Sequence, residues 1–312
     1  MTRILITGAA GMVGRSLLAE LADTDHEVIA CDVAVPEDLP DNARFRPMDV
    51  TTDAPLRVIA RHQPDVIVHL ASIVTPPPGS GRDFAYDVDV TGTKNVVNAA
   101  LAAGTKRLVV TSSGAAYGYH ANNPVPLTET DAIRGNEEFA YAHHKRLVEE
   151  FLADTRHNAP HLEQVILRVG TVLGRETNNQ ITDLFRRPRL LAVSGSESPF
   201  VFIWTRDLAR ILRRAATNGP AGIFNVAGDG ALGVQDLADI LQKPILRLPA
   251  WVFKAALASA RPLGLSQYGP EQVRFLQYRP VLSNEALKRN FGYTPEKTSR
   301  EVFDHWLKAQ DK

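Results

Sequence analysis

Residues 3–14 read Arg3-Ile4-Leu5-Ile6-Thr7-Gly8-Ala9-Ala10-Gly11-Met12-Val13-Gly14, and this stretch decides the fold that we predict. It starts with a short apolar run typical of a strand, and the apolar spacing from Met12 to Leu21 indicates a helix with one buried face. The glycines between them indicate a tight turn. Glycines let the backbone approach a pyrophosphate, and the free N–H groups at a helix start attract its negative charge. The stretch therefore predicts a dinucleotide site at Gly8, Gly11 and Gly14, with Met12 and Val13 beside it.

A second strand is predicted from Glu27 to Cys31, and it ends in Asp32, eighteen residues after Gly14. A carboxylate at this place can accept hydrogen bonds from both ribose hydroxyls of an adenosine and repels a 2′-phosphate. We therefore predict NAD rather than NADP as the cofactor, with Val33 next to Asp32 in its site. The alternative is a surface aspartate that merely ends a strand.

Strand-like runs recur along the chain with helical patterns between them, at residues 4–6, 28–31, 66–70, 107–111 and 164–168. This alternation predicts an α/β fold, a doubly wound parallel sheet of the Rossmann type. Ligands of such sheets bind at the carboxyl ends of the strands. The residues expected there are Gly8, Asp32, Leu70-Ala71-Ser72, Thr111-Ser112-Ser113 and Val169-Gly170-Thr171.

Two segments near the expected cofactor allow more than one interpretation. Asp49-Val50 could place a carboxylate near the adenine amino group, and the alternative is a plain loop aspartate. Pro76–Gly81 is rich in turn-forming residues, which indicates a surface loop beside the cofactor. Such a loop could act as a partial lid.

The 312 residues permit one large domain or two modest ones. After about Leu173 the regular alternation is lost, which suggests smaller elements added to the sheet. A strand and helix return at residues 200–216, followed by a strand at 223–226. We predict an NAD-binding domain from residues 1–172 plus about 200–227, and a smaller substrate-binding part from about 173–199 plus 228–312.

Composition excludes several classes of function. The 35 basic and 35 acidic residues cancel, so no global field favours nucleic acid or anionic lipid. The single cysteine, Cys31, excludes an internal disulfide and a cysteine-rich metal site, and the histidine pair His143-His144 has no evident third zinc ligand. We expect no catalytic metal.

No leader pattern or membrane-length apolar run is visible, so we expect a soluble cytoplasmic protein.

Tyr141 and Lys145 are four residues apart in a segment, residues 139–152, that has a helical pattern. Their side chains therefore project from one face of the helix. A free tyrosine phenol has a pKa of about 10, too high for a general base at neutral pH, but a fixed cation nearby favours the phenolate. Near a dinucleotide site the pair predicts redox chemistry at Tyr141. An ordinary exposed helix pair is the alternative.

Ser113 is the natural third member of this site. It follows the apolar strand 107–111 at the carboxyl edge of the sheet, where its hydroxyl could bond the substrate oxygen that also meets Tyr141. Ser112 competes for the same role, and either serine could be a simple turn residue. The residues alone leave this choice open.

Several motifs together resemble the extended short-chain dehydrogenase/reductases: residues 7–14, His69-Leu70-Ala71-Ser72, residues 111–118, Tyr141–Lys145 and Leu167-Arg168-Val169-Gly170. More narrowly, the chain resembles the NAD-dependent epimerase/dehydratase family, typified by UDP-galactose 4-epimerase. The resemblance is dense from residue 1 to about 175 and recurs at residues 205–209. The family motif places the catalytic hydroxyl four residues before the tyrosine of Tyr117-Gly118, which selects Ser113.

The resemblance implies that hydride passes from a substrate carbinol to NAD while Tyr141 removes the hydroxyl proton, giving a transient ketone. Return of hydride to the other face makes an epimerase, and release of the ketone makes a dehydrogenase. Sugar dehydratases of the family carry an Asp-Glu pair directly after the catalytic hydroxyl, whereas this chain has Gly114-Ala115. Elimination is therefore disfavoured.

Two departures from the family pattern bear on the substrate. Nucleotide-sugar members carry an arginine seven residues before the aspartate that matches Asp207, and this chain has Phe200 there. Arg274 or Arg279 could supply the missing charge. The second departure is Asp89, where the family has asparagine. As residues that contact substrate we predict Thr171, Phe200 and Arg274.

The sequence as a whole predicts an NAD-dependent epimerase or oxidoreductase that acts on a hydroxyl-bearing, possibly nucleotide-sugar, substrate. One alternative is a dehydrogenase or reductase of a less polar alcohol or ketone, which the apolar run 199–204 would suit. Another is a non-catalytic dinucleotide sensor. The resemblance also implies a homodimer formed by helices at about residues 85–103 and 139–155.

Overall fold

A seven-stranded sheet forms the centre of the computed structural model, which describes residues 1–74, 79–80, 82–260 and 269–310. All its strand pairs are parallel, and the strand order is β10-β6-β5-β4-β1-β2-β3. The strands are β1 (Arg3–Thr7), β2 (Glu27–Asp32), β3 (Ala43–Pro47), β4 (Val66–His69), β5 (Arg107–Ser113), β6 (Glu163–Val169) and β10 (Gly222–Val226). The order reverses between β1 and β4, which makes the sheet doubly wound. The predicted fold class is confirmed.

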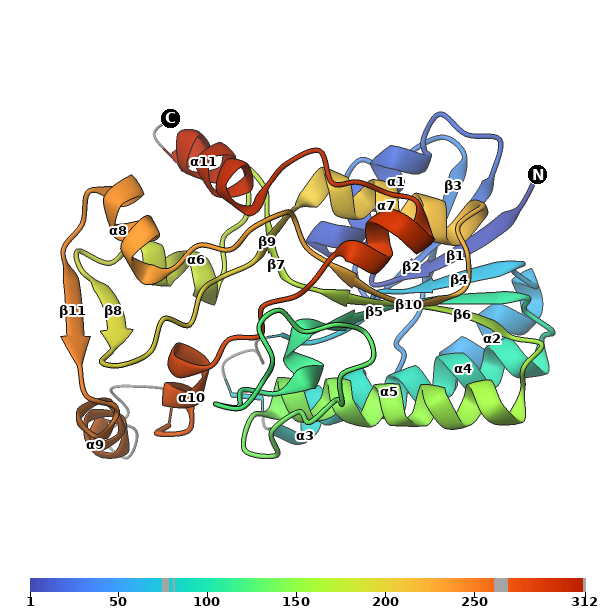
Figure 1. Cartoon of the computed structure of the whole chain (residues 1–312). Helices are drawn as coiled ribbons and strands as arrows, with labels where there is room; N and C mark the ends of the chain where they lie inside the picture. The colour runs from blue at the N-terminus through green and yellow to red at the C-terminus, as the bar shows by residue number, and fades with distance from the viewer. Residues whose placement is uncertain (75–78, 81, 261–268, 311–312) are drawn as a thin grey trace.

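Helices cover both faces of this sheet (Figure 1). One face carries α1 (Met12–Leu21) and α7 (Thr205–Thr217), and the other carries α2 (Ala54–His62), α4 (Gly92–Ala102) and α5 (Ala140–Asn158). Side chains alternate along each strand. Ile4 and Ile6 therefore lie in the hydrophobic core on one face of the sheet, and Leu5 lies in the core on the other face. Burial on both faces explains why the strands are nearly all apolar.

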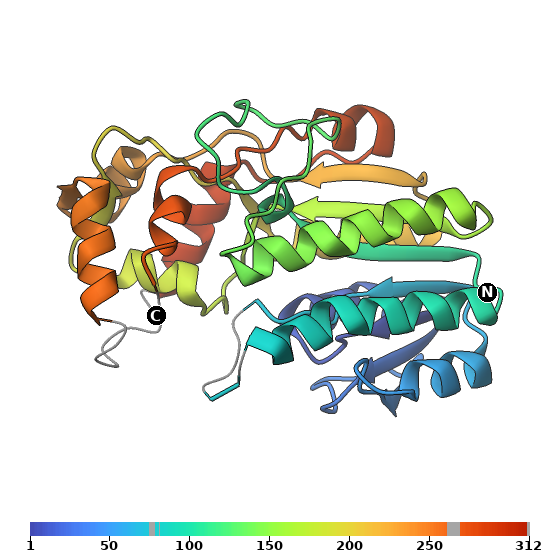
Figure 2. The same cartoon turned by 90° about the horizontal axis from the view of Figure 1, so that it is seen from below.

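A smaller group of elements lies beside the carboxyl ends of the strands (Figure 2). Two short parallel pairs belong to it: β7 (Thr171–Leu173) with β9 (Phe202–Trp204), and β8 (Leu190–Val193) with β11 (Ile245–Leu248). Its helices are α6 (Gln180–Arg186), α8 (Val234–Leu241), α9 (Ala250–Ala260), α10 (Gln272–Gln277) and α11 (Ser299–Gln310). Aromatic side chains fill a third core here, namely Phe185, Phe200, Phe202, Phe303 and Trp306.

Short helical segments complete the chain: α3 (Arg82–Tyr86), the π-helical turn η1 (Asp87–Thr91), the 3₁₀ turn η2 (Gly114–Tyr117) and the π-helical turn η3 (Leu287–Phe291). The expectation that the late elements add to the sheet is right for β10 and wrong for the two short pairs, which are separate sheets. Leu173 of β7, Phe202 of β9, and Leu190 and Ala192 of β8 are buried instead in the third core. The division into two domains remains a prediction.

Two further expectations concern the surface of the molecule. The loop Pro76–Gly81 lies largely outside the residues that the structure describes. Across the described ranges, we find no helix with the length and apolar character that a membrane span requires.

Candidate functional site

Two glycines of the first loop allow close packing between β1, α1 and the end of β4. Gly8 has a φ of +69°, and a Cβ on it would lie 2.7 Å from the backbone nitrogen of Ala71. A Cβ on Gly14 would lie 2.3 Å from the carbonyl oxygen of Gly8. A larger residue at Gly8 would push the loop away from the end of β4, and one at Gly14 would push α1 away from the loop.

The third glycine has a different surrounding. A Cβ on Gly11 would meet only the carbonyl oxygen of Gly8, at 3.3 Å. Gly11 is also the N-cap residue of α1, and no side chain caps the first turn of that helix. N–H groups at an uncapped helix start bind anions, and the small surface of Gly11 lets a ligand approach them. This geometry fits the pyrophosphate of a dinucleotide beside Met12 and Val13.

Asp32 lies at the carboxyl end of β2, next to the same loop. Its Oδ2 accepts a hydrogen bond from the Ala10 backbone nitrogen at 2.9 Å. Its Oδ1 accepts hydrogen bonds from the backbone nitrogens of Val33 at 2.7 Å and Ala34 at 3.3 Å. The carboxylate is thus fixed beside the glycine-rich loop, where the sequence predicts contact with ribose.

Asp49 follows β3, and its carboxylate is occupied locally. Its Oδ1 accepts hydrogen bonds from the backbone nitrogen of Thr51 at 2.9 Å and from the Thr51 hydroxyl at 2.8 Å. This arrangement favours the alternative interpretation, a loop aspartate that stabilises its own turn. The neighbouring Val50 is 6 % exposed, and its carbonyl oxygen accepts a hydrogen bond from Asn95.

His69 organises the end of β4. Thr93 donates to the carbonyl oxygen of Asp89, so its oxygen accepts from His69 Nε2 at 2.9 Å. His69 Nδ1 then accepts from the Thr7 hydroxyl at 2.7 Å, and the Thr7 oxygen in turn accepts from the backbone nitrogens of Leu70 and Ala71. Burial, together with the nearby charge of Lys145, lowers the pKa of His69 to about 3 and keeps the ring neutral.

This network fixes the backbone at Leu70 and Ala71, which the sequence predicts to contact the cofactor. The hydrogen-bonding role of His69 depends on Thr7 and Thr93, which lie 62 and 24 residues away in the chain. No local pattern could have revealed it.

Tyr141 and Lys145 lie on consecutive turns of α5, as predicted. The Lys145 Nζ lies 5.5 Å from the centroid of the Tyr141 ring and donates a hydrogen bond to the carbonyl oxygen of Thr111 at 3.0 Å. Ser113 ends β5, and its Oγ accepts from the backbone nitrogen of Ala115 at 3.1 Å. Ala115 and Tyr141 pack in one cluster, so Ser113 and Tyr141 border the same small region.

The two candidate serines have different surroundings. Ser112 is 3 % exposed, and its Oγ donates to Glu149 Oε1 at 2.5 Å. Its hydroxyl is therefore directed into the interior between β5 and α5. Ser113 is partly exposed and keeps its hydroxyl near Ala115. The contacts of Ser112 favour Ser113 for the catalytic role.

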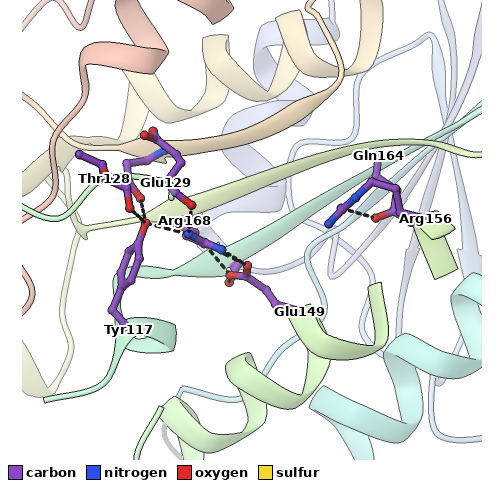
Figure 3. A network of polar contacts seen from close by, with 9 residues as sticks. Tyr117, Thr128, Glu129, Glu149, Arg156, Gln164 and Arg168 are labelled. Atoms are coloured by element: carbon purple, nitrogen blue, oxygen red, sulfur yellow. Dashed lines mark hydrogen bonds and ion pairs between the residues drawn. The ribbon is translucent and has the colours of Figure 1, made fainter. Parts of the chain in front are cut away.

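A buried ion pair between Arg168 of β6 and Glu149 of α5 lies behind the site (Figure 3). Arg168 donates to Glu149 through Nε at 3.0 Å and Nη2 at 2.7 Å, and through Nη1 to the Tyr117 hydroxyl at 2.8 Å. Burial opposes the charge, but the hydrogen bonds and the charge of Glu149 outweigh it and raise the pKa of Arg168. This network holds Ser112, and hence the chain before Ser113, against α5.

A cleft of about 330 Å³ lies between the chain after η2 and the helices α9 and α10. The Tyr119 ring forms part of its wall and also belongs to the apolar cluster of Tyr141. Arg274 lines the cleft and pairs with Glu138 at 3.2 Å. The full lining is Tyr119, His120, Ala121, Asn122, Lys254, Arg274, Gln277 and Tyr278. The cleft therefore adjoins the apolar cluster of Tyr141 and has the basic side chains Lys254 and Arg274 in its wall.

Phe200 lies in the third core with 5 % of its surface exposed. The Arg279 guanidinium stacks on its ring, 3.7 Å from the centroid, and donates through Nε to the Ser198 carbonyl oxygen at 2.8 Å. Burial lowers the pKa of Arg279, and no described carboxylate forms an ion pair with it. Arg279 therefore places its guanidinium on the face of the Phe200 ring.

The remaining predicted residues occupy the expected sheet edge. Val169 ends β6 with 7 % exposed, and the Thr171 backbone nitrogen donates to the carbonyl oxygen of Val201 at 3.0 Å. The side chain of Val33 is 73 % exposed. In the ranges that the structure describes, no group of three or more histidine, cysteine, aspartate or glutamate residues is placed to hold a metal ion.

A family model described as NAD-dependent epimerase/dehydratase matches residues 4–227. The chain belongs to the NAD-dependent epimerase/dehydratase family. The resemblance predicted from the motifs is thereby confirmed, and the chain is a member of a family of enzymes. The family description names NAD, in agreement with the cofactor predicted from the first loop and Asp32.

Individual proteins resemble the chain at low sequence identity. An uncharacterized protein of Mycobacterium bovis is 24% identical over 98% of this chain and 84% of its own length. A 3-beta-hydroxysteroid dehydrogenase of Mycolicibacterium neoaurum is 28% identical over 66% of this chain and 52% of its own. The UDP-glucose 4-epimerase of Thermotoga maritima, solved with UDP-glucose, has a TM-score of 0.76 at 17% identity, covering 99% of this chain and 100% of the epimerase. The last similarity supports the fold.

Proposed function

We propose that this chain oxidises a substrate hydroxyl with NAD through Ser113, Tyr141 and Lys145, as an epimerase or oxidoreductase. The observation that carries the proposal is the cation of Lys145, fixed by Thr111 beside the Tyr141 ring. A lysine held in this way favours the phenolate of Tyr141. Tyr141 packs against the buried cluster that contains Ala115, two residues after Ser113, and this supports Ser113 as the third member.

The residues of the site divide the chemistry between them. Bound NAD supplies the acceptor for the hydride. Tyr141 takes the hydroxyl proton at its phenolate oxygen, and Lys145 stabilises that phenolate. Ser113 donates a hydrogen bond to the substrate oxygen and holds it beside Tyr141. Thr111, through its carbonyl, prevents Lys145 from turning away.

We assign the NAD site to the uncapped start of α1, with Gly11, Met12 and Val13, and to Asp32. A negative charge at Asp32 should favour NAD over NADP by at least about tenfold, or about 1.4 kcal/mol. Titration of the protein with both cofactors tests this assignment. D32S should reduce the preference, whereas the exposed D41N should leave it unchanged. Equal affinities in the native protein would refute the assignment.

For the substrate we favour a hydroxyl compound that carries an anionic group, such as a nucleotide sugar. The 330 Å³ cleft with Lys254 and Arg274, and the stacked cation of Arg279, support this class. The second candidate is a less polar alcohol or ketone, turned over by a simple dehydrogenase or reductase. Phe200 in place of an arginine supports it, as does the similarity to a 3-beta-hydroxysteroid dehydrogenase.

The outcome of the reaction can be tested by denaturing the freshly purified protein and quantifying the nucleotide released. Near-stoichiometric NAD or NADH indicates a cofactor regenerated in place, as an epimerase requires. A protein that is purified empty and binds NAD weakly indicates a dehydrogenase that exchanges cofactor in each turnover. A non-catalytic sensor would bind NAD and yet turn over neither alcohols, ketones nor nucleotide sugars.

We also propose a homodimer built from helices at about residues 85–103 and 139–155, on the strength of the family resemblance. Sedimentation equilibrium tests it, and a mass of one chain, 34.2 kDa, at all concentrations would contradict it. A cytoplasmic location remains a prediction from the sequence.

A further inference from the structure

The cleft that adjoins the Tyr141 cluster begins directly after the family motif. That motif ends at Gly118, and Tyr119 is the first residue beyond it. Tyr119 forms part of the wall of the cleft of about 330 Å³, and the other lining residues come from 120–122, from α9 and from the end of α10. A residue outside the shared motif, in a cleft next to the candidate catalytic residues, is placed to select the substrate.

The ring of Tyr119 is fixed by its neighbours. It is 7 % exposed and packs against the rings of Phe139 and Phe275, with the centroids 4.9 Å and 5.6 Å away. The Tyr119 backbone nitrogen donates to Asn136 Oδ1 at 2.7 Å. These contacts fix the ring and, with it, the position of the hydroxyl.

The hydroxyl of Tyr119 has no hydrogen-bond partner among the described residues, whereas buried tyrosine hydroxyls usually have one. The buried Tyr117, by contrast, donates to Asn225 Oδ1 and accepts from Arg168 Nη1, both at 2.8 Å. The Tyr119 hydroxyl is also not among the fully enclosed polar atoms of the described chain that lack a partner, so solvent reaches it. Because Tyr119 lines the cleft and is otherwise buried, its hydroxyl is accessible from the cleft.

Two basic side chains line the same cleft. Lys254 of α9 forms no ion pair or hydrogen bond with a described residue. The Nε of Arg274, on α10, pairs with Glu138 at 3.2 Å, which leaves its two Nη groups without a described partner. Among the described residues that line the cleft, none is acidic. A cleft with this charge attracts an anion.

The wall that carries Tyr119 is preorganised. His120 donates through Nε2 to the carbonyl oxygen of Arg134 at 2.8 Å, and Asn123 donates to the carbonyl oxygen of Gly118, also at 2.8 Å. The segment after η2 is thus held by its own hydrogen bonds. A ligand that binds to an ordered wall loses little affinity to the ordering of the protein.

We propose that the cleft is a subsite for a phosphate or carboxylate group of the substrate, in which Tyr119, Lys254 and Arg274 bind the anionic oxygens. The three side chains come from three separate segments, and hydrogen bonds to an ionised group are stronger than those between neutral groups. Burial raises the pKa of the Tyr119 phenol, so the hydroxyl keeps its proton and serves as a donor. The inference deepens the proposed function and rests on it.

This subsite is separate from the cation of Arg279. The Phe275 ring contacts both the Tyr119 ring, at 5.6 Å, and the Arg279 guanidinium, at 5.3 Å, but Arg279 does not belong to the described lining of the cleft. A nucleotide sugar with its diphosphate at Arg279 would therefore place a second anionic group, carried by the sugar, in the cleft. The substrate class that we infer is a compound whose reacting part itself carries an acid group.

The test measures anion binding and needs no turnover. Inorganic phosphate and acetate are titrated by isothermal calorimetry into the protein saturated with NAD, at constant ionic strength, so that the anion site at the start of α1 is filled. We expect Y119F and K254M each to raise the Kd of the anion about tenfold, because each removes one charge-assisted hydrogen bond. Tighter binding of phosphate indicates a phosphorylated substrate, and tighter binding of acetate indicates a carboxylate.

Two control variants show whether these effects belong to the cleft. Y119F should keep the melting temperature of the parent, because its hydroxyl has no described partner to lose. Y293F should show the opposite pattern: the Tyr293 hydroxyl bonds Asp207 at 2.7 Å, so its removal should lower the melting temperature and leave the Kd unchanged. K308M, which removes an exposed lysine of α11, should also leave the Kd unchanged.

An unchanged Kd in Y119F or K254M, or a parent protein that binds neither anion, would overturn the subsite. Y141F separates the subsite from the proposed function. Anion binding that Y119F weakens, together with full turnover by Y141F, would refute the proposed function and leave the subsite intact. Loss of turnover in Y141F, together with a parent protein that binds neither anion, would support the proposed function and refute the subsite.

Discussion

Lys145 donates its Nζ hydrogen bond to the carbonyl oxygen of Thr111, two residues before Ser113 in the same strand. One end of β5 thus fixes the ammonium group beside the Tyr141 ring and also carries the hydroxyl proposed to bind substrate. The relative position of the three groups depends on the packing of α5 against β5, and not on a flexible loop.

Removing the phenol hydroxyl should abolish turnover without loss of cofactor binding. Y141F is expected to reduce kcat by at least about 100-fold, since no other group is proposed to accept the proton, while the Kd for NAD changes by less than about threefold. Steady-state kinetics and cofactor titration measure the two effects. The control is Y293F, whose hydroxyl bonds Asp207 far along the chain from the site. Unchanged turnover by Y141F would refute the mechanism.

The ion pair of Glu149 with Arg168 should be important for stability. E149Q keeps an acceptor but leaves the buried guanidinium of Arg168 without a compensating charge, so we expect the free energy of unfolding to fall by about 3 kcal/mol. Urea denaturation measures it. E150Q is the matched control, because Glu150 is half exposed and should change stability by less than about 0.5 kcal/mol. Equal free energies of unfolding for E149Q and E150Q would contradict a stabilising role of the ion pair between Glu149 and Arg168.

His69 should make stability depend on pH. Its pKa is about 3 in the folded chain and about 6.5 in the unfolded chain, so between these values the unfolded state binds one more proton. The contribution is fully present above pH 6.5 and is lost as the pH falls. At pH 5 the loss amounts to about 2 kcal/mol relative to pH 7. In H69Q position 69 cannot titrate. We therefore expect the free energy of unfolding of H69Q to fall between pH 7 and pH 5 by about 2 kcal/mol less than that of the native chain. Denaturation of both proteins at the two pH values measures this difference.

The sequence predicts the fold well because local patterns carry the information. Each central strand is buried on both faces, so its apolar run and the helices between strands are visible without tertiary contacts. Tyr141 and Lys145 are likewise neighbours on one helix. The network of Glu149 with Arg168 and the contacts of Asp89 with Ser72 and His144 join distant segments, and no spacing rule predicts them.

Arg279 provides a test between the two substrate classes. Its guanidinium stacks on Phe200 and forms no ion pair with a described carboxylate, so an anionic substrate group could compensate its charge. For a nucleotide sugar we expect R279Q to raise KM about tenfold with little change in kcat, because the substrate would lose one charge-assisted hydrogen bond. For an uncharged alcohol, R279Q should leave KM unchanged. R289Q is the control, because the Arg289 side chain is 80% exposed on η3. A KM for nucleotide sugars that is insensitive to R279Q would exclude Arg279 from the site and favour the less polar substrate.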